Sequence, residues 1–591
     1  MDRQTTIGFV LIFVLLMAWM YMNAPNESTK QQKATAARID SAKSELAKPQ
    51  PLPIPAAKEN PGKFFSQRTV GQEQTYRIET ELYSAELSTK GGLIRKWDLK
   101  KYKTWNGFPV QMVDYRSGGD LNLIFTTSDG KLVNTKEFFF DLKSPGAIVD
   151  LKKNNFEFEV VYELPIPGGG ALRKTYNFNN SRYDVQVEFQ FINLSNVVSN
   201  FQYQVLWENG LQYAEHNSVD ESGFAAAYAF AGKELTEVDA SHVGEKATKE
   251  LSGKVDWIAT RTKYFGVALI PSGVATDGAV IVGNRAGVSD NGIIERYELA
   301  LKIPFKGSND ERASVGVFLG PLDHTLLKSY DNGLEHIMSL GAAWIIRPIA
   351  EYVFLPLFLF LHTFISNWGI VIIIFSIIIK LALHPLSRSQ MRSMKKMQAL
   401  QPLMEEVKEK YKDDPAKMNQ AVMNLYKEYG VNPAGGCLPL ILQLPILYAL
   451  FSVFRSAIDL RQANFFGWIH DLSIPDIAFS LPLTLPIFAV KDISGIALVM
   501  GVTMFVQQKM TVKDPRQKAM VWMMPVMMTL MFNGFPSGLN LYYTMFNIFS
   551  IAQQIFIDKQ GGNEPLRKVE PKKKGRGGFF GKLGDIPRLK K

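Results

Sequence analysis

The chain has 591 residues, of which 46% are hydrophobic and 12% are aromatic. This length exceeds one ordinary domain, and the uneven distribution of the apolar residues excludes a soluble single-domain enzyme. The formal net charge of +10 is also unevenly distributed, because most of the excess lies in residues 559–591.

The N-terminal residues 1–22 are predicted to form a membrane anchor. They contain the apolar run "IGFVLIFVLLMAWMYM", with Trp19 and Tyr21 near its far end, where an interfacial aromatic belt would lie. A cleaved signal peptide is the alternative, but the run is long for that role and no A-x-A site follows it. Residues 23–61 are polar and then proline-rich, which predicts a disordered linker.

Residues 62–330 are predicted to form a large antiparallel β-sandwich. Apolar and polar residues alternate in "YRIETEL" (76–82), "FEFEVVYEL" (156–164) and "YDVQVEFQFINL" (183–194). Alternation with period two is typical of strands with one buried face. His216 and His242 are isolated in this region, so we expect the domain to scaffold or bind rather than to catalyse.

Residues 331–366 are predicted to form an interfacial amphipathic helix. Only "SNWG" separates their apolar run from the next span, which is expected at 367–386. If both runs crossed, the basic loop 387–433 would lie outside the cell, against the positive-inside rule. Glu351, Pro356 and His362 also suit a helix that lies along the interface.

The third to sixth spans are expected within residues 434–558. Apolar segments occur there at about 435–456, 494–511, 519–535 and 538–557. Together with the anchor and the span at 367–386, they predict a polytopic α-helical membrane protein with six spans. Both termini are then cytoplasmic and the sandwich lies on the opposite side of the membrane.

The loop 387–433 is predicted to form a cytoplasmic helical hairpin. One amphipathic helix is expected in "MQALQPLMEEVKEKY" (397–411), and a second should be capped by Asp414 and begin at Pro415. Gly430 and Pro433 should end the second helix. The apolar seam is expected to be the hairpin's own core, built from Met397, Leu400, Met404, Val407, Tyr411, Met418, Val422, Leu425 and Tyr429.

Basic residues on the predicted cytoplasmic side are candidates for binding a partner. We expect binding positions in the hairpin region 387–433 and in the basic cytoplasmic tail 559–591, namely Arg388, Arg392, Lys395, Lys396, Lys572, Lys573, Lys574 and Arg576. A solvated tail of this kind serves topology or binds anionic lipid, whereas ribosomal RNA is the more specific alternative.

Lys380 lies within the apolar stretch "IIIFSIIIKLALHPL". A charge inside a membrane costs roughly 2.5–3.5 kcal/mol on insertion scales, which makes it a candidate functional group; snorkelling to the surface is the alternative. Ser376 is one turn away on the same face. Polar residues of other spans suggest a hydrated cavity, namely Gln443, Gln507, Gln508, Asn540, Tyr542, Tyr543, Thr544 and Asn547.

Several functions are disfavoured by what the sequence lacks. Its last five expected spans contain no Asp or Glu, which argues against a proton-coupled transporter. Cys437 is the lone cysteine and is read as a packing residue, and the seven histidines never have metal-ligand spacing. No nucleotide-binding G-x-x-x-x-G-K-[ST] motif occurs. We therefore expect no metal, no nucleotide and no other cofactor.

Four motifs occur in an order and at spacings that closely resemble the YidC family of membrane protein insertases. They are "NPAGGCLPLILQLPILYALF", "RQANFFGWIHDLS", "LVMGVTMFVQQKM" and "FPSGLNLYY". An anchor followed by a large sandwich looks like the Gram-negative branch, which implies a periplasmic sandwich similar in fold to galactose mutarotase-like domains. The resemblance implies a bacterial inner-membrane location.

The resemblance also implies a hydrophilic groove that receives the polar end of an incoming protein. The family's groove cation falls on Lys380 and its hydroxyl neighbour on Ser376. Its substrate-touching positions fall on Gln443 and Leu444, and its tyrosine on Tyr543. Many members have arginine where this chain has lysine, so charge is kept but the planar five-donor fork is lost.

The expected function is that of an insertase and folding chaperone rather than an enzyme. By resemblance, it would insert nascent membrane proteins alone or with the Sec translocon, while the hairpin and tail meet ribosomes or the signal-recognition machinery. Two rivals remain open at this point. A transporter of small anions could also use Lys380, and a membrane-anchored exported carbohydrate-active domain would depend on the sandwich.

Overall fold

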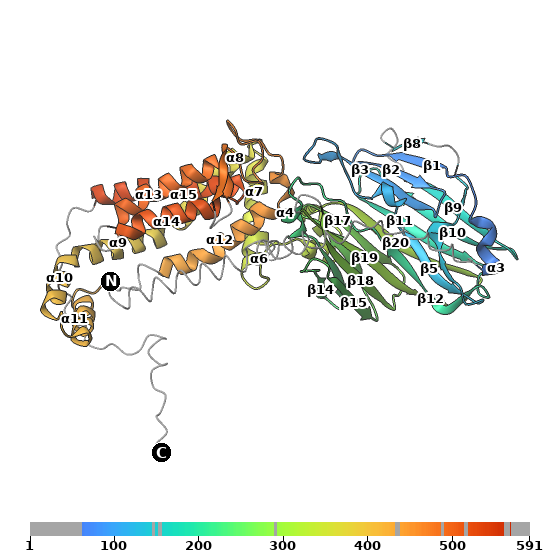
Figure 1. The fold of residues 1–591 in the computed structure, drawn as a ribbon, viewed down its shortest axis with the longest axis horizontal. Coiled ribbons are helices and arrows are strands. Elements are labelled where there is room, and N and C mark those ends of the chain that lie inside the picture. Colours follow the sequence, from blue (N-terminus) through green and yellow to red (C-terminus); the bar gives the residue numbers. More distant parts are fainter. Residues whose placement is uncertain are drawn as a thin grey trace, which may run out of the picture. The chain divides into compact units, whose positions relative to one another are not determined.

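The structure is a computed structural model, shown in Figure 1. It describes residues 62–144, 148–151, 157–288, 292–431, 438–485, 490–512, 518–560 and 568. The expected anchor 1–22, the linker 23–61, Cys437 and the tail residues Lys572, Lys573, Lys574 and Arg576 lie outside the described residues. The chain divides into two compact units, Met1–Ser339 and Leu340–Lys591, and each is described by itself.

The first unit contains three sheets. The five-stranded sheet has the order β4 (Pro109–Gln111), β3 (Leu93–Lys103), β2 (Tyr83–Ser88), β1 (Thr75–Glu79) and β8 (Ile148–Asp150). The nine-stranded sheet has the order β14 (Glu234–Val238), β13 (Ala226–Ala231), β16 (Trp257–Arg261), β17 (Phe265–Ser272), β20 (Asp310–Pro321), β11 (Asp184–Ile192), β10 (Gly170–Phe178), β9 (Phe158–Ile166) and β7 (Asp141–Leu142). The six-stranded sheet has the order β15 (Lys246–Ser252), β18 (Gly278–Val288), β19 (Gly292–Pro304), β12 (Val198–Trp207), β5 (Asn122–Thr127) and β6 (Leu132–Asn134).

The two larger sheets pack face to face (Figure 1). Aromatic side chains fill part of the core between them. Phe191 of β11 is fully buried, and its ring lies 4.6 Å from that of Tyr203 on β12 and 6.2 Å from that of Phe125 on β5. All described strand pairs of the three sheets are antiparallel except β1 with β8 in the five-stranded sheet. The predicted antiparallel β-sandwich is therefore confirmed. Short helices α3 (Gly62–Phe65), α4 (Ser218–Ser222) and α5 (His324–Lys328) accompany the sheets.

The second unit is mainly helical. Its helices are α6 (Ile346–Ile349), the π-helical η7 (Ala350–Phe354), α7 (Leu355–His362), α8 (Trp368–Ala382), α9 (His384–Ala399), α10 (Gln401–Lys410), α11 (Pro415–Glu428), α12 (Leu438–Ser456), α13 (Gly495–Thr511), α14 (Lys518–Phe532) and α15 (Ser537–Gln560). Strands β21 (Phe479–Leu485) and β22 (Val490–Ile493) form a short antiparallel pair. Helix α15 packs against both α8 and α13, and α13 also packs against α14. Among the described residues, no helix has both the length and the apolarity that a bilayer crossing requires.

The segment expected to be an interfacial helix is helical from Ile346 to His362 but changes its winding. The π-helical turn η7 separates α6 from α7 and precedes Pro356, which is tolerated in the first turn of α7. Arg347 Nε of α6 lies 3.1 Å from the carboxylate of Glu351 in η7, and both side chains are largely buried. The charge of Glu351 is thus compensated by a basic residue one turn away.

Helices α10 and α11 form a small helical pair with its own core. Leu400, Met404 and Leu425 are buried there, and Met397, Val422 and Tyr429 pack against them, as predicted. Asp414 caps α11 by accepting a hydrogen bond from Lys417 N at 3.1 Å, and Pro415 begins the helix, also as predicted. The expected single helix over 397–411 is wrong: α9 ends at Ala399 and α10 begins at Gln401. Pro402 lacks the N–H needed to continue a helix and is placed in the first turn of α10 instead.

Candidate functional site

Lys380 lies on α8, inside the bundle formed with α13 and α15. Helix α8 begins where Asn367 caps it by accepting a hydrogen bond from Ile370 N at 3.2 Å. The Lys380 ammonium donates to Ser550 Oγ of α15 at 2.6 Å and lies 4.2 Å from the centroid of the Phe546 ring. Only 8% of Lys380 is exposed. The cation is therefore held between two helices by one hydroxyl and one aromatic face.

The sequences of α8, α12, α13 and α14 contain no Asp or Glu, and Asp558 is the sole acidic residue of α15. Asp558 lies 2.7 Å from Lys395 Nζ, so this carboxylate already has a basic partner. A buried ammonium without a carboxylate partner keeps an electrostatic preference for an anionic group. The site can therefore attract an acidic guest.

Ser376 lies one turn before Lys380 and is fully buried. Its hydroxyl donates to Ile372 O of the same helix at 2.7 Å. On the same side of α8, the ring of Phe375 lies 6.2 Å from that of Tyr542 on α15. Lys380 and Phe375 of α8 therefore contact α15, and Ser376 is buried on α8 one turn before Lys380.

Polar side chains also join α13 to α15. Asn547 Nδ2 donates to Thr503 Oγ1 at 3.2 Å and lies 3.4 Å from Met500 O. Gln507 lies one turn beyond Thr503 and is half-buried. The ring of Tyr543 lies 5.2 Å from that of Phe532 on α14. Asn547 thus makes a polar contact between α15 and α13, and Tyr543 makes an aromatic contact between α15 and α14.

Gln443 and Leu444 lie on α12. Gln443 is half-buried, whereas 43% of Leu444 is exposed. The described contacts of Lys380 reach α15 rather than α12. The structure therefore places the two predicted substrate-touching positions on a different helix from the cation, with Leu444 available for contact with an apolar segment.

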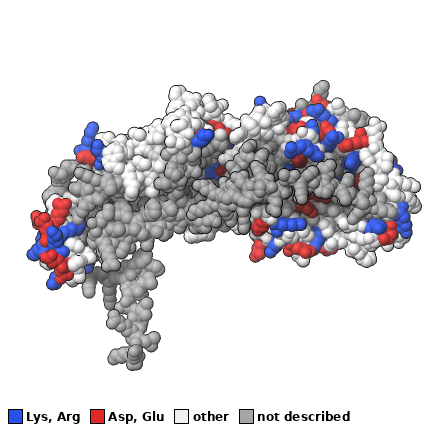
Figure 2. Space-filling model, in the orientation of Figure 1, with Lys and Arg blue, Asp and Glu red and all other residues white. Residues whose placement is uncertain are grey.

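The predicted partner-binding residues differ in what they contact. Lys395 on α9 is tied to the end of α15, because it pairs with Asp558 and donates to Ile557 O at 3.1 Å. Arg388 and Lys396 are exposed on α9, and Arg392 belongs to the same helix. Figure 2 shows basic and acidic side chains gathered over α10 and α11, while the described surface of α13 and α14 carries few charges.

Ser550 and Phe546 are the contacts of Lys380 that sequence reasoning missed. A signal was present, because polar residues recur at spacings of three or four along α15 and all are buried: Asn540, Thr544, Asn547, Ser550 and Gln554. This spacing places them on one face of a helix. Their sequence positions alone do not show which of them meets a lysine 170 residues away.

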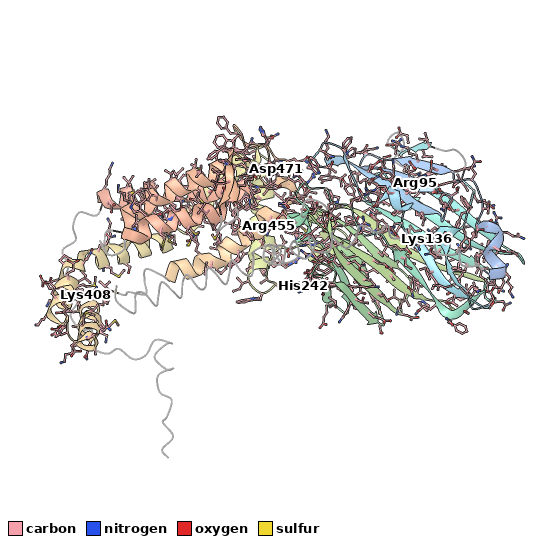
Figure 3. The ribbon with its side chains drawn as sticks, viewed as in Figure 1. Arg95, Lys136, His242, Lys408, Arg455 and Asp471 are labelled. Atoms are coloured by element: carbon pink, nitrogen blue, oxygen red, sulfur yellow. The ribbon has the colours of Figure 1, made fainter. Side chains whose placement is uncertain are left out.

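A carboxylate in the segment between α12 and β21 was also missed. Asp476 accepts hydrogen bonds from Trp468 Nε1 at 2.7 Å, from Ser494 Oγ at 2.5 Å, and from the backbone N–H groups of Gly495 and Ile496 at 2.8 and 3.1 Å. It therefore fixes the N-terminus of α13. In Figure 3, Asp471 of this segment and Arg455 of α12 lie near one end of the helical unit, and Lys408 of α10 lies at the other.

These features define a two-unit protein that has a β-rich unit and a mainly helical unit with a buried cation. Residues 360–564 match the model of the 60Kd inner membrane protein family, and residues 75–352 match that of the YidC periplasmic domain. The membrane protein insertase YidC of Chloroherpeton thalassium is 39% identical over 96% of this chain and 97% of its own length. That of Chlorobaculum tepidum is 38% identical over 94% and 95%. The chain belongs to the YidC family of membrane protein insertases.

Solved structures give weaker similarities. A crystal structure of active YidC insertase with its first transmembrane domain resolved is 20% identical, covers 82% of this chain and 93% of its own, and has a TM-score of 0.35. A galactose mutarotase related enzyme from Lactobacillus acidophilus is 10% identical, covers 42% of this chain and 97% of its own, and has a TM-score of 0.26.

Proposed function

We propose that this insertase works through a hydrated cationic groove whose charge is Lys380. The observation that carries the proposal is the buried Lys380 ammonium, which is bound to Ser550 and faces an aromatic ring, in a bundle whose helices have almost no acidic residues. An acidic chain end of a client would lose part of its hydrating water in the groove, and its attraction to the Lys380 ammonium would compensate for that loss. Lys380 would then return to Ser550 when the guest leaves.

The mechanism needs no chemical reaction. A polar chain end pays a large desolvation cost in hydrocarbon, and a hydrated groove shortens the dry distance that it must cross. Burial of the client's own apolar segment, at about 25 cal/mol per Å², drives the insertion. In the proposed groove, Ser376, Gln507, Tyr542, Tyr543 and Asn547 accompany Lys380, while Gln443 and Leu444 on α12 meet the client segment.

The proposed topology has six spans, formed by residues 1–22, 367–386 and the four apolar segments of 434–558. The charge distribution supports it, because the basic residues of 387–433 belong on the cytoplasmic side. Asp471 and Lys408 lie near opposite ends of the helical unit (Figure 3), as this orientation requires. The sandwich is then periplasmic and both termini are cytoplasmic.

The proposed partners follow from the same orientation. Nascent membrane proteins enter the groove, either on this insertase alone or with the Sec translocon. The exposed Arg388 and Lys396 and the charged surface of α10 and α11 would meet ribosomes or the signal-recognition machinery. The basic tail would contact anionic lipid or ribosomal RNA.

The test is insertion of a small single-span client with an acidic outer tail into liposomes that contain only this protein. Protease protection of the client is compared for the native protein, Lys380→Ala and Lys380→Arg. We expect Lys380→Ala to impair insertion of this client, Lys380→Arg to retain it, and a client with a neutralised tail to be affected less. Equal insertion by native protein and Lys380→Ala would contradict the role of the charge.

A further inference from the structure

The hairpin between β3 and β4 presents two large aromatic side chains to solvent. Trp105 is 57% exposed and Phe108 is 66% exposed, and both lie at the tip of the edge hairpin of the five-stranded sheet. Lys101 and Lys103 are exposed on the strand that leads to the tip. Exposed aromatic rings next to lysines on a turn are not explained by the packing of the sandwich, whose core lies elsewhere.

The conformation of this tip is fixed by its own hydrogen bonds. Thr104 N donates to Phe108 O at 2.7 Å, and Gly107 N donates to Thr104 O at 3.0 Å, with Gly107 at a φ of +86° that favours glycine. Trp105 N donates to Ala214 O of a neighbouring segment at 3.1 Å, and its ring meets the ring of His216 edge-on at 4.5 Å. The turn that carries both exposed rings is therefore fixed, and these backbone groups would enter an apolar medium already paired.

We propose that the 104–108 tip is a membrane-surface anchor that inserts Trp105 and Phe108 among lipid headgroups, with Lys101 and Lys103 attracting anionic lipid. Tryptophan prefers the interface between water and hydrocarbon, and basic residues near an anionic surface are attracted to it electrostatically. A protein partner fits less well, because a stable interface buries about 800 Å² on each side and two rings on a turn supply much less.

The anchor differs in place and purpose from the insertion groove. Because the chain belongs to a membrane protein family, a bilayer is always near the domain, and a weak contact gains from its high effective concentration. The contact would hold the sandwich at the membrane surface, whichever leaflet it faces. It does not depend on Lys380 or on how clients are inserted.

The test relies on site-directed spin labelling, which is simple here because the chain has a single cysteine to replace. In full-length protein carrying Cys437→Ser, a nitroxide is attached at Asn106→Cys in the tip or, as the matched control, at Ser308→Cys in the exposed turn between β19 and β20. The protein is reconstituted into vesicles of phosphatidylcholine with or without phosphatidylglycerol. Collision of each label with oxygen, which partitions into lipid, and with a water-soluble nickel chelate reports its depth.

We expect several-fold lower nickel collision and higher oxygen collision at position 106 than at position 308. The difference should shrink with Trp105→Ser and Phe108→Ser together, and Lys101→Glu with Lys103→Glu should reduce it only in vesicles with phosphatidylglycerol. The charge variants keep the rings and so remain informative if the aromatic variant misfolds. Equal nickel collision at both positions would overturn the proposal, and so would protection of position 106 that persists in detergent without a bilayer, which would indicate a protein contact.

Discussion

The ammonium of Lys380 on α8 donates a hydrogen bond to the hydroxyl of Ser550 on α15, and the two residues are 170 positions apart in the chain. This bond crosses the contact between two helices that both line the candidate site. It gives the cation a defined resting position without neutralising it. The next step in the cycle we propose is exchange of Ser550 for an acidic group of the client.

Ser550→Ala should separate the position of the charge from the charge itself. The substitution removes the acceptor but keeps the ammonium, and a hydrogen bond to a charged group contributes about 1.5–3 kcal/mol. We expect a several-fold slower initial rate of insertion for acidic-tailed clients, and a smaller loss than with Lys380→Ala, in the liposome assay.

Ser376→Ala is the matched control for this measurement. Its hydroxyl is equally buried but bonds within its own helix to Ile372 O rather than to Lys380, so its removal should slow insertion less than Ser550→Ala does. If Ser376→Ala slowed insertion more than Ser550→Ala, the resting position of Lys380 on Ser550 would not matter for function.

Asp476 should stabilise the segment between α12 and β21. Asp476→Ala leaves the indole N–H of Trp468 and the N–H groups of Gly495 and Ile496 without their acceptor. The expected cost is about 2 kcal/mol in the free energy of unfolding, measured by thermal unfolding of the purified protein in detergent. Asp476→Asn keeps one oxygen acceptor and should cost less; an equal loss in both variants would show that the negative charge matters more than the hydrogen bonds.

Helices α13 and α14 should depend on the absence of a side chain at Gly501. A Cβ at this position would lie 2.0 Å from Thr529 Oγ1, which is closer than atoms can pack. We therefore expect Gly501→Ala to lower the thermal midpoint of the protein, with overpacking worth about 1–3 kcal/mol.

Thr529→Ala should rescue Gly501→Ala, because it removes the hydroxyl that the new methyl group meets. Thermal unfolding of the two single variants and the double variant forms a complete cycle. Additive losses in the double variant would indicate that Gly501 is needed for a reason other than close packing against Thr529.

Sequence reasoning located those elements whose patterns are local. The alternating segment 183–194 coincides with β11 (Asp184–Ile192), since one buried face imposes a period of two. Asp414 and Pro415 marked the start of α11 because capping involves residues three apart. The break at Leu400 was missed because an apolar spacing of three and four continues through it, although Pro402 carried the signal.

The candidate site was predictable only in part, for a physical reason. Lys380 could be recognised from the sequence, because a charged residue in an apolar stretch is costly to bury whatever its neighbours are. Its partners Ser550 and Phe546 depend on how α8 and α15 pack, which the periodicity of either helix does not specify. Asp476 was missed for the same reason. Its hydrogen-bond donors are distant in the chain, because Trp468 lies 8 residues before it and Ile496 lies 20 residues after it.

The last prediction concerns acid and the five-stranded sheet. Burial alone would raise the pKa of Glu79, but hydrogen bonds from Lys100, Ser84 and Arg77 outweigh it and lower the pKa to about 2. Lys100 Nζ lies 2.6 Å from the Glu79 carboxylate and Ser84 Oγ lies 2.8 Å from it. Because the folded-state pKa is lower than the unfolded one, Glu79 stabilises the fold above its ordinary pKa, and this contribution is lost as the pH falls toward about 2.

Glu79→Gln should therefore lower stability at neutral pH by about 1 kcal/mol and reduce the loss on acidification. The measurement is the urea midpoint of the full-length protein in detergent, followed by tryptophan fluorescence at about pH 7 and about pH 3. Glu81→Gln on the following turn is the control, because it changes the same charge on a residue whose carboxylate lies outside these ion pairs. Parallel acid profiles of the native protein and Glu79→Gln would show that the Glu79 carboxylate contributes nothing to the acid sensitivity of the sandwich.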